Sequence, residues 1–500
     1  MSVVKLVLLN EVQCKFEGLT PQVRSELIKT VTYKDWSKQF TPAVKLGRWD
    51  GKVSFMNMGG KTYIHLLDKL LPILEKKGIA VEIEDKREDP NEWDMGTITD
   101  QYLADIEFAK GHHMEGKSII LREHQVETVN TLLANRHGII EAATGAGKTL
   151  ICAALARKVQ DYGRTIVIVP STDLVTQTEE DYLLCGLDVG VLYGGRKEFD
   201  KTHTICTWQS LHALWKKSKK KARGEVEMDT QDIFEFLDGV ACVIVDECHT
   251  AKGEALKQAL GEVMGNIKLR WGLTGTMPKD EILAKQINLN VGPVLGKVQA
   301  KDLQDKGYLS SCDVNIIQLK SDLKFSEYSE ELTYLVSDET RMKYISNLID
   351  AMSHSGNTLV LVDRISCGNA IIDNIGLPKE NFVNGSTPKK KRESAYSSIA
   401  DVDNEIIVAT YGVAAVGLNI PRIYNLVLIE PGKSFVRTIQ SIGRGLRKAK
   451  DKDHVQIYDI CSNLKYSAKH MRERKKYYVD AEYPFEHIRV ADWEDNLGDE

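Results

Sequence analysis

A glycine-containing segment at residues 142–149 is the first place where residue types and spacing could do chemistry. It reads Ala142-Ala143-Thr144-Gly145-Ala146-Gly147-Lys148-Thr149, follows an apolar stretch and precedes a helical pattern. This fits the phosphate-loop pattern G-x-x-x-x-G-K-[ST], except that alanine replaces the first glycine. Backbone N–H groups near the glycines can approach phosphate oxygens, and the helix start adds a favourable dipole. The segment predicts that Lys148 holds the β- and γ-phosphates and Thr149 ligates Mg²⁺; the alternative is a strand–turn–helix corner with an incidental lysine.

Two adjacent acids, Asp246 and Glu247, end a second apolar stretch, Val243-Ile244-Val245. At the carboxyl end of a strand, Asp246 could hold Mg²⁺ and Glu247 could orient and deprotonate an attacking water. The alternative is a solvated loop. His249 either couples the nucleotide to a second lobe or caps a turn.

Two arginines, Arg444 and Arg447, follow Gln440 near the end of the chain. Their i, i+3 spacing places them on one face of a helix, and arginines presented to a γ-phosphate stabilise charge during its transfer. Gln440 is expected to contact the nucleotide or its water. For Arg447 the alternative is a nucleic-acid phosphate contact from a basic helix that also carries Lys448 and Lys450.

Elements that could position these residues are visible as apolar runs. One set reads Gly138–Glu141, Thr165–Val169, Thr204–Thr207, Cys242–Val245 and Leu269–Leu273; a second reads Thr358–Val362, Asn381–Val383, Glu405–Ala409, Asn425–Ile429 and Val455–Ile460. Continuous apolar strands alternating with helical patterns suit parallel sheets covered on both faces. The sequence therefore predicts an α/β protein with two doubly wound sheets in tandem.

A shorter α+β pattern precedes these sheets. Strands are predicted at 3–9 and 80–84, helices at 21–31 and 66–77, and a hairpin from 52–57 and 61–65 around Gly59-Gly60. The predicted domains are a small basic module at 1–88, a linker and entry to the first lobe at 89–115, lobes at 116–295 and 296–480, and an acidic, frayed tail at 481–500. A hinge is predicted at 292–299.

An ordered set of motifs across residues 119–450 resembles the superfamily II helicases. The set comprises the loop at 142–149, Asp246-Glu247-Cys248-His249, Thr274-Gly275-Thr276 and the segment 440–447. Arg122 and Gln125 lie in a segment that resembles the adenine contact of this family. The resemblance implies two RecA-like lobes with an ATP site between them, ATP and Mg²⁺ as cofactors, and coupling through His249, Thr274 and Thr276.

Departures from the family pattern favour DNA over RNA. The tetrad is not Asp-Glu-Ala-Asp, and Thr-Gly-Thr replaces Ser-Ala-Thr, which resembles the DNA-translocating branch with RecG-like and restriction-subunit motors. Together with the overall length, the small first domain with Arg48-Trp49-Asp50-Gly51-Lys52 is similar to bacteriophage recombination helicases. This likeness implies branch migration, fork regression and unwinding of D-loops and R-loops. Three alternatives remain: an RNA helicase, a restriction motor subunit, and a nucleic-acid binding or annealing protein switched by ATP.

Nucleic-acid contacts are expected from three sources. The motif resemblance implies contacts by Thr172, Gln177, Thr207, Gln209, Arg364 and Thr410. In the first module, bases and aromatics interleave at Lys34–Phe40 and at Arg48, Trp49 and Lys52; a hydrophobic core with a solvated rim is the alternative. Six basic residues within 215–223, among them Lys216, Lys217, Lys219, Lys220 and Lys221, predict a mobile loop near duplex phosphates, or a solubilising loop. Arg472, Arg474, Lys475 and Lys476 are predicted to lie on a solvated helix face.

Composition sets the remaining expectations. The net charge is −5, yet residues 1–77 carry 13 basic against 7 acidic residues, so a basic surface for a polyanion is expected. Nine scattered cysteines without a C-x-x-C pair favour reduced thiols. The start has no signal-peptide pattern and no apolar run suits a membrane span, so a soluble cytoplasmic monomer is expected, in the host cell if phage-encoded. Expected partners are branched or duplex DNA, an RNA–DNA hybrid, and single-strand-binding or recombination proteins.

Overall fold

A computed structural model describes residues 3–89, 93–108, 114–225, 232–251, 256–388, 391–392, 402–414, 422–432 and 453–494. The chain divides into two compact units, residues 1–142 with 147–297 and residues 143–146 with 298–500. The first unit contains the amino-terminal module and one large sheet, and the second contains another large sheet. The architecture is α/β, with two RecA-like lobes that follow a small α+β domain.

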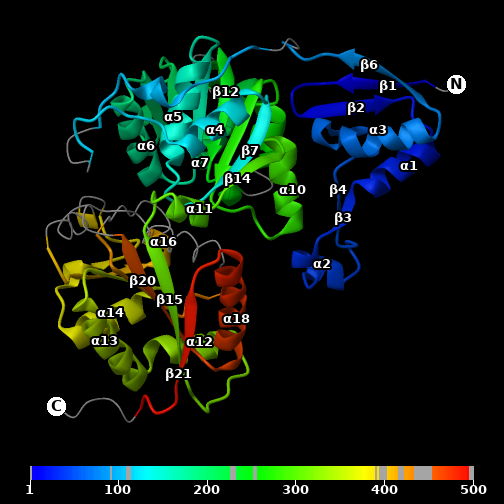
Figure 1. The fold of residues 1–500 in the computed structure, drawn as a ribbon. Helices are drawn as coiled ribbons and strands as arrows, with labels where there is room; N and C mark the ends of the chain where they lie inside the picture. Colours follow the sequence, from blue (N-terminus) through cyan, green and yellow to red (C-terminus); the bar gives the residue numbers. More distant parts are fainter. Residues whose placement is uncertain are drawn as a thin grey trace. The chain divides into compact units, whose positions relative to one another are not determined.

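The amino-terminal module is a four-stranded sheet covered by two helices (Figure 1). The strand order is β5-β2-β1-β6, and β3 and β4 form a separate antiparallel pair. The bounds are β1 (Val3–Leu8), β2 (Gln13–Glu17), α1 (Pro21–Thr30), β3 (Thr32–Lys34), α2 (Pro42–Lys45), β4 (Lys52–Ser54), β5 (Lys61–Tyr63), α3 (Leu67–Lys76) and β6 (Ala80–Asp85). The predicted hairpin of residues 52–57 with 61–65 is wrong, because β4 pairs with β3 whereas β5 pairs with β2.

The core of this module extends onto the first lobe. Leu6, Phe16 and Leu70 share one buried cluster with Ile282 and Leu289, which belong to α10 (Glu281–Asn290) of the lobe. The module therefore shares its hydrophobic core with the lobe.

The first lobe is built on an eight-stranded sheet of order β10-β9-β11-β8-β12-β13-β7-β14. Its elements are α4 (Glu123–Leu133), β7 (His137–Ala142), α5 (Lys148–Val159), β8 (Arg164–Val169), α6 (Thr172–Leu184), β9 (Val189–Tyr193), β10 (Arg196–Lys197), β11 (His203–Thr207), α7 (Trp208–Ala222), α8 (Ile233–Leu237), β12 (Val240–Asp246), β13 (Leu269–Thr274), α10 and β14 (Val294–Val298). The central strands are buried and parallel, as their continuous apolar sequences require. The predicted hinge at 292–299 contains the edge strand β14.

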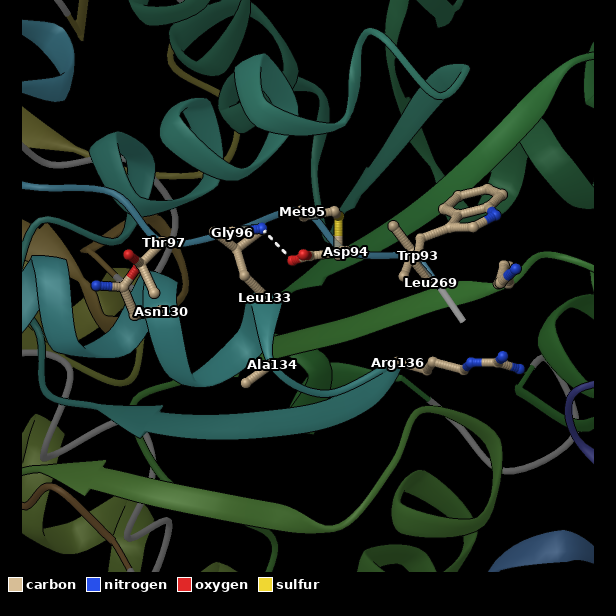
Figure 2. Close-up of a pocket in the computed structure, with 11 residues that line it drawn as sticks. Trp93, Asp94, Met95, Gly96, Thr97, Asn130, Leu133, Ala134, Arg136 and Leu269 are labelled. Carbon is tan, nitrogen blue, oxygen red and sulfur yellow. Dashed lines mark hydrogen bonds between the residues drawn. The ribbon is translucent and has the colours of Figure 1, made fainter. Parts of the chain in front are cut away.

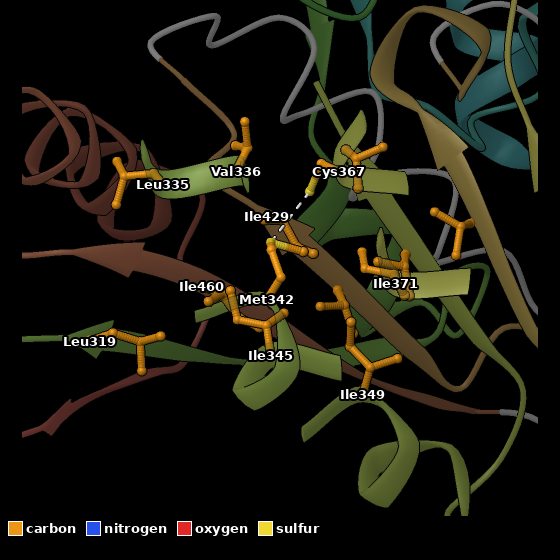
Figure 3. Packing of buried hydrophobic residues seen from close by; sticks show 14 of the residues in the cluster. Leu319, Leu335, Val336, Met342, Ile345, Ile349, Cys367, Ile371, Ile429 and Ile460 are labelled. Carbon is orange, nitrogen blue, oxygen red and sulfur yellow. Dashed lines mark hydrogen bonds between the residues drawn. The ribbon is translucent and has the colours of Figure 1, made fainter. Parts of the chain in front are cut away.

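The second lobe has a seven-stranded sheet of order β17-β18-β16-β19-β20-β15-β21 with parallel pairing. Its elements are α11 (Ala300–Asp305), β15 (Ser311–Leu319), α12 (Tyr328–Ser337), α13 (Glu339–Ser353), β16 (Thr358–Val362), α14 (Ile365–Ile375), β17 (Phe382–Val383), β18 (Ile406–Thr410), α16 (Tyr411–Ala414), β19 (Asn425–Ile429), β20 (His454–Ser462), α18 (Lys465–Asp480) and β21 (Phe485–Val490). Figure 3 shows α12, α13 and α14 contributing Leu335, Met342 and Ile371 to one core against β19 and β20.

Three sequence predictions are corrected here. Residues 216–222 are not a loop but the last turns of α7, whose apolar side chains Leu211 and Leu214 are buried. The tail from 481 is not frayed throughout, because β21 pairs with β15 and Trp493 is buried with its indole N–H donating to the Lys320 carbonyl, 2.6 Å. Arg474 does not lie on a solvated face, because it is buried beside Asp459.

The predicted linker is folded where the structure describes it. Within residues 93–108, Met95, Ile98 and Leu103 are buried, and Trp93 stacks on Tyr162 with ring centroids 5.2 Å apart. None of the helices in the described part of the chain is both long enough and apolar enough to cross a membrane.

Candidate active site

The segment that joins β7 to α5 has the backbone shape of a phosphate loop. Gly145 and Gly147 have φ values of 87° and 81°, which glycine adopts without the steric cost of a side chain. Gly147 is the residue before α5, so the helix starts at Lys148 with Thr149 next. Free N–H groups at a helix start favour anions. Thr144 and Ala146 complete the loop, and Ala146 is buried.

The predicted adenine segment lies against this loop. Arg122 precedes α4, and its backbone N–H donates to Oε1 of Gln125, 2.9 Å. This hydrogen bond holds the buried side-chain amide of Gln125 in place. As a result, a Cβ atom added at residue 147 would collide with Nε2 of Gln125. The backbone conformation at 147 and the nearby Gln125 side chain therefore both favour glycine there.

Lys148 bridges the loop and the acidic pair. Its Nζ lies 3.1 Å from Oε1 of Glu247 and donates to the Ala142 carbonyl, 3.3 Å. The fold thus brings Lys148, which follows β7, next to Glu247, which follows β12, although the two residues are far apart in the sequence.

The acids Asp246 and Glu247 stand where β12 ends. Glu247 has φ 47°, a left-handed conformation that is uncommon outside glycine and that clusters at functional sites. Its backbone N–H donates to Asp246 Oδ1, 2.9 Å. Burial, together with the neighbouring charge of Glu247, raises the pKa of Asp246 to about 6. Burial opposes ionisation of Glu247 too, but Lys148 and His249 outweigh it and hold the pKa of Glu247 well below its usual range.

His249, Thr274 and Thr276 form a connected group beside Glu247. His249 Nδ1 lies 2.7 Å from Thr274 Oγ1 and 3.3 Å from Glu247 Oε2. The Thr274 hydroxyl donates to the Thr276 carbonyl, 2.9 Å, and the Gly275 N–H donates to Glu247 Oε2, 3.4 Å. The end of β13 is thereby linked through His249 to the carboxylate of Glu247.

The oxygen donors of this site suit Mg²⁺. Thr149 offers a hydroxyl at the start of α5, and Asp246 offers a half-buried carboxylate whose ionisation a nearby cation would favour. Hydroxyl and carboxylate oxygens are the donors that this hard cation accepts.

The candidate nucleic-acid residues of the lobes lie at the carboxyl ends of strands. Thr172 begins α6 after β8, with Gln177 in the same helix, and Thr207 caps α7 with Gln209 exposed beside it. Asp246 ends β12 of the same parallel sheet, so Thr172 and Thr207 share its edge with the acidic pair. In the second unit Arg364 precedes α14, where its Nη1 donates to Thr333 Oγ1, 3.0 Å, and Thr410 ends β18.

The remaining candidates are spread over other surfaces. Arg48 and Lys52 are exposed, whereas Trp49 is half-buried and its indole N–H donates to the Lys52 carbonyl, 2.9 Å. On α7, Lys216, Lys219 and Lys220 are exposed, and Lys217 lies beside Lys197, whose charge lowers the pKa of Lys217. Lys221 pairs with Asp232 and Glu235 at 3.4 and 3.0 Å. Gln440, Arg444 and Arg447 lie outside the described residues.

A separate cavity of about 250 Å³ does not belong to this site (Figure 2). It is lined by Trp93, Asp94 and Arg136 among others, and by Leu269 at the start of β13. Thr274, at the other end of β13, belongs to the group around His249, so the cavity and the acidic pair lie at opposite edges of the sheet.

Sequence reasoning missed the backbone groups of the site. The Ala142 carbonyl and the Gly275 N–H hold Lys148 and Glu247, but every residue carries such groups. No sequence signal could have singled them out.

Comparisons with known proteins give two family matches and several similar proteins. Residues 118–279 match the family model "Type III restriction enzyme, res subunit", and residues 340–449 match "Helicase conserved C-terminal domain". Together the two matches span more than half of the chain. The chain is 26% identical to the ATP-dependent DNA helicase uvsW of Enterobacteria phage T4, over 90% of this chain and 88% of that protein. It is 22% identical to the helicase/translocase subunit XPB/SSL2 of Saccharomyces cerevisiae, over 74% and 44% of the two chains.

A solved structure supports the fold. A fragment of a putative HsdR subunit of a type I restriction enzyme from Vibrio vulnificus matches with a TM-score of 0.54 at 15% identity, over 88% of this chain and 78% of that one. At this identity the likeness concerns the fold alone.

Proposed function

Because this chain belongs to the superfamily II helicases and is an ATP-dependent DNA helicase, we propose that it remodels branched DNA. The proposed reactions are branch migration, fork regression and unwinding of D-loops and R-loops in recombination, repair and replication. The observation that carries the motor chemistry is the Lys148–Glu247 ion pair beside the half-buried Asp246. The similarity to a phage helicase supports the choice of DNA and a place in the host cytoplasm.

In the proposed hydrolysis, Glu247 accepts the proton of the attacking water. The low pKa of Glu247 keeps its carboxylate ionised. The contacts of this carboxylate with the Gly275 N–H and with His249 orient it. Lys148 moves to the β- and γ-phosphates, and Thr144, Gly145 and Gly147 present backbone N–H groups to them. Thr149 and Asp246 would hold Mg²⁺, which would supply neutralising charge at the phosphates. Gln440, Arg444 and Arg447 of the second lobe are proposed to complete the site.

The group at His249, Thr274 and Thr276 supports a coupling role. A change at the γ-phosphate that displaces Glu247 also displaces His249, 3.3 Å away, and through it the end of β13. Thr172 follows β8 and Thr207 ends the neighbouring strand β11, so the two residues are proposed to contact a phosphate backbone in step with the nucleotide.

Lys148→Ala tests the motor assignment. ATPase activity and strand displacement should fall to background, because the phosphates lose their cation, while DNA binding without ATP and the circular dichroism spectrum stay unchanged. Lys476→Ala, an exposed lysine on α18, is the matched control and should behave as the wild type. ATP-driven unwinding by Lys148→Ala protein would contradict the assignment.

A substrate panel tests the choice of branched DNA. ATPase stimulation and strand displacement are measured with a fork, a Holliday junction, a D-loop, an R-loop, linear duplex DNA and duplex RNA of equal length. We expect the branched DNAs and the R-loop to exceed linear duplex and RNA. Equal or greater stimulation by duplex RNA would favour an RNA helicase, and ATP-dependent affinity changes without strand displacement would favour an annealing protein.

A further inference from the structure

An exposed tip on the amino-terminal module has no role in the chemistry described so far. The tip is residues 34–48, which run from the end of β3 through a short 3₁₀ turn, Trp36–Lys38, and α2. Figure 1 shows α2 at the end of the β3–β4 pair, away from the four-stranded sheet of the module.

Large apolar side chains on this tip face solvent. Trp36 is 61% exposed, Phe40 73% and Leu46 64%. These three residues lie within one short segment of the chain, and exposed large apolar side chains that gather on one surface mark interaction sites more often than scattered single residues do.

The backbone beneath these side chains is fixed. Asp35 is buried, and its Oδ1 accepts hydrogen bonds from the Ser37 N–H, 3.1 Å, and the Ser37 hydroxyl, 2.6 Å. The Asp35 N–H donates to the Gly51 carbonyl, 2.7 Å, and the Arg48 and Trp49 N–H groups donate to the Ala43 carbonyl. The apolar side chains therefore project from a turn whose backbone is fixed by hydrogen bonds.

The charges around these side chains select the partner. Residues 32–54 contain five basic residues, Lys34, Lys38, Lys45, Arg48 and Lys52, against Asp35 and Asp50. Of the two acids, Asp35 is buried and paired with Lys38 at 3.2 Å, and Asp50 lies 3.6 Å from Lys52. Lys34 Nζ lies 4.0 Å from the Trp36 ring centroid, where the cation and ring attract each other. Aromatic rings among basic residues suit a polyanion that carries planar rings.

We propose that the tip binds unpaired nucleobases of single-stranded DNA at a branch, with Trp36 and Phe40 stacking on bases and the surrounding basic residues contacting phosphates. Base faces are accessible only where strands are unpaired, so the aromatic rings contribute on single strands and not on intact duplex. The inference deepens the proposed function, since it gives that activity a means of recognising a branch.

The test compares full-length wild type with the double variant Trp36→Ala/Phe40→Ala, by fluorescence anisotropy without ATP. One probe is a fork with two unpaired arms, and the other is a blunt duplex of the same length. We expect the double variant to bind the fork at least about tenfold more weakly, because each stack contributes ~1–3 kcal/mol, and to bind the duplex within about twofold of wild type. Phe234→Ala, which removes a 66% exposed ring from α8, is the matched control and should change neither affinity.

Salt dependence separates stacking from charge. The aromatic variant should keep the wild-type slope of log affinity against log salt on the fork, whereas Lys45→Ala should lower it by ~0.7, one released counterion on a single strand. Trp36→Tyr, which retains a ring, should restore most of the fork affinity.

Two results would overturn the inference: unchanged fork affinity in the double variant, or an equal loss of affinity for fork and duplex. Since no ATP is present, these results do not depend on the remodelling activity. If the wild type showed no preference for branched DNA in the substrate panel but the tip still bound forks, only the proposed function would be contradicted.

Discussion

At the residue scale, the site depends on how charges are distributed between Asp246, Glu247 and Lys148. One acid has a raised pKa and the other a lowered one, although they are neighbours in the chain. Two carboxyl groups whose environments separate their pKa values can take different roles. Here Glu247, which Lys148 and His249 keep ionised, suits the base, and Asp246, which is ionised above a pH of about 6, suits a cation ligand.

The first residue-scale prediction concerns the base. Glu247→Gln keeps the shape of the side chain but cannot accept a proton, so kcat for ATP hydrolysis should fall by about 10²- to 10⁴-fold. Binding of a fluorescent ATP analogue should persist. Glu82→Gln, an exposed acid on β6, is the control. Near wild-type turnover in Glu247→Gln protein would remove Glu247 from this role.

The second residue-scale prediction follows from the raised pKa of Asp246, about 6 in the free protein. Below that pH the carboxyl group takes up a proton and loses its affinity for Mg²⁺, and above it the group is ionised. The kcat/KM for ATP, which reports the free enzyme, should therefore fall as the pH drops through about 6. A higher Mg²⁺ concentration favours the ionised form of Asp246 and should shift this acidic fall in kcat/KM to lower pH. A fall whose position does not change with Mg²⁺ would point to another group.

At the element scale, α18 shows what sequence patterns reveal and what they miss. The helix carries Arg472 and Arg474 two positions apart, and nothing in their types distinguishes them. In the fold, Arg474 makes two hydrogen bonds of 2.8 Å to Asp459 of β20, and the Tyr478 hydroxyl donates to the same carboxylate. Arg472 is exposed.

Arg474→Ala should therefore destabilise the second lobe by about 3–5 kcal/mol, because it leaves the buried Asp459 without its counter-charge. Arg472→Ala on the same helix should cost less than about 0.5 kcal/mol. Urea unfolding of both variants provides the comparison. Equal effects would show that the buried pair adds nothing beyond helix propensity.

Local sequence patterns predicted some features of the fold and site, and missed those that depend on long-range packing. The strands around the phosphate loop were predictable because a parallel sheet covered on both faces needs continuous apolar runs, as in β8 (Arg164–Val169). Lysine-rich residues 216–222 were misread, since their charge hid a helix held by Leu211 and Leu214. The 3.1 Å approach of Lys148 to Glu247 follows from sheet order, which only long-range packing decides.

At the scale of the whole molecule, the amino-terminal module and the first lobe are joined by more than a covalent linker. Ile282 and Leu289 of α10 are buried among the module's own core residues. Glu11 also lies 3.8 Å from Arg136, an ion pair that links the module to the lobe. We expect the two to unfold together.

Leu289→Ala tests this joint unfolding. The change leaves a cavity in the shared core, so the free energy of unfolding should fall by about 2–5 kcal/mol. Hydrogen exchange should accelerate in both β1 and β13, although the substituted residue lies only in the lobe. Leu183→Ala, whose side chain is 57% exposed on α6, is the control. Faster exchange confined to the module would show that it opens independently.

The contact between Lys148 and Glu247 has a consequence for when the proposed base can act. The lysine that is proposed to hold the phosphates of ATP is the same one that neutralises the proposed base, so it cannot serve both fully at once. Phosphates that draw Lys148 away also release Glu247 to accept a proton. A nucleotide without a γ-phosphate competes less well for the lysine and leaves the base restrained. In the proposed mechanism, ATP binding itself thus frees the base that acts in ATP hydrolysis.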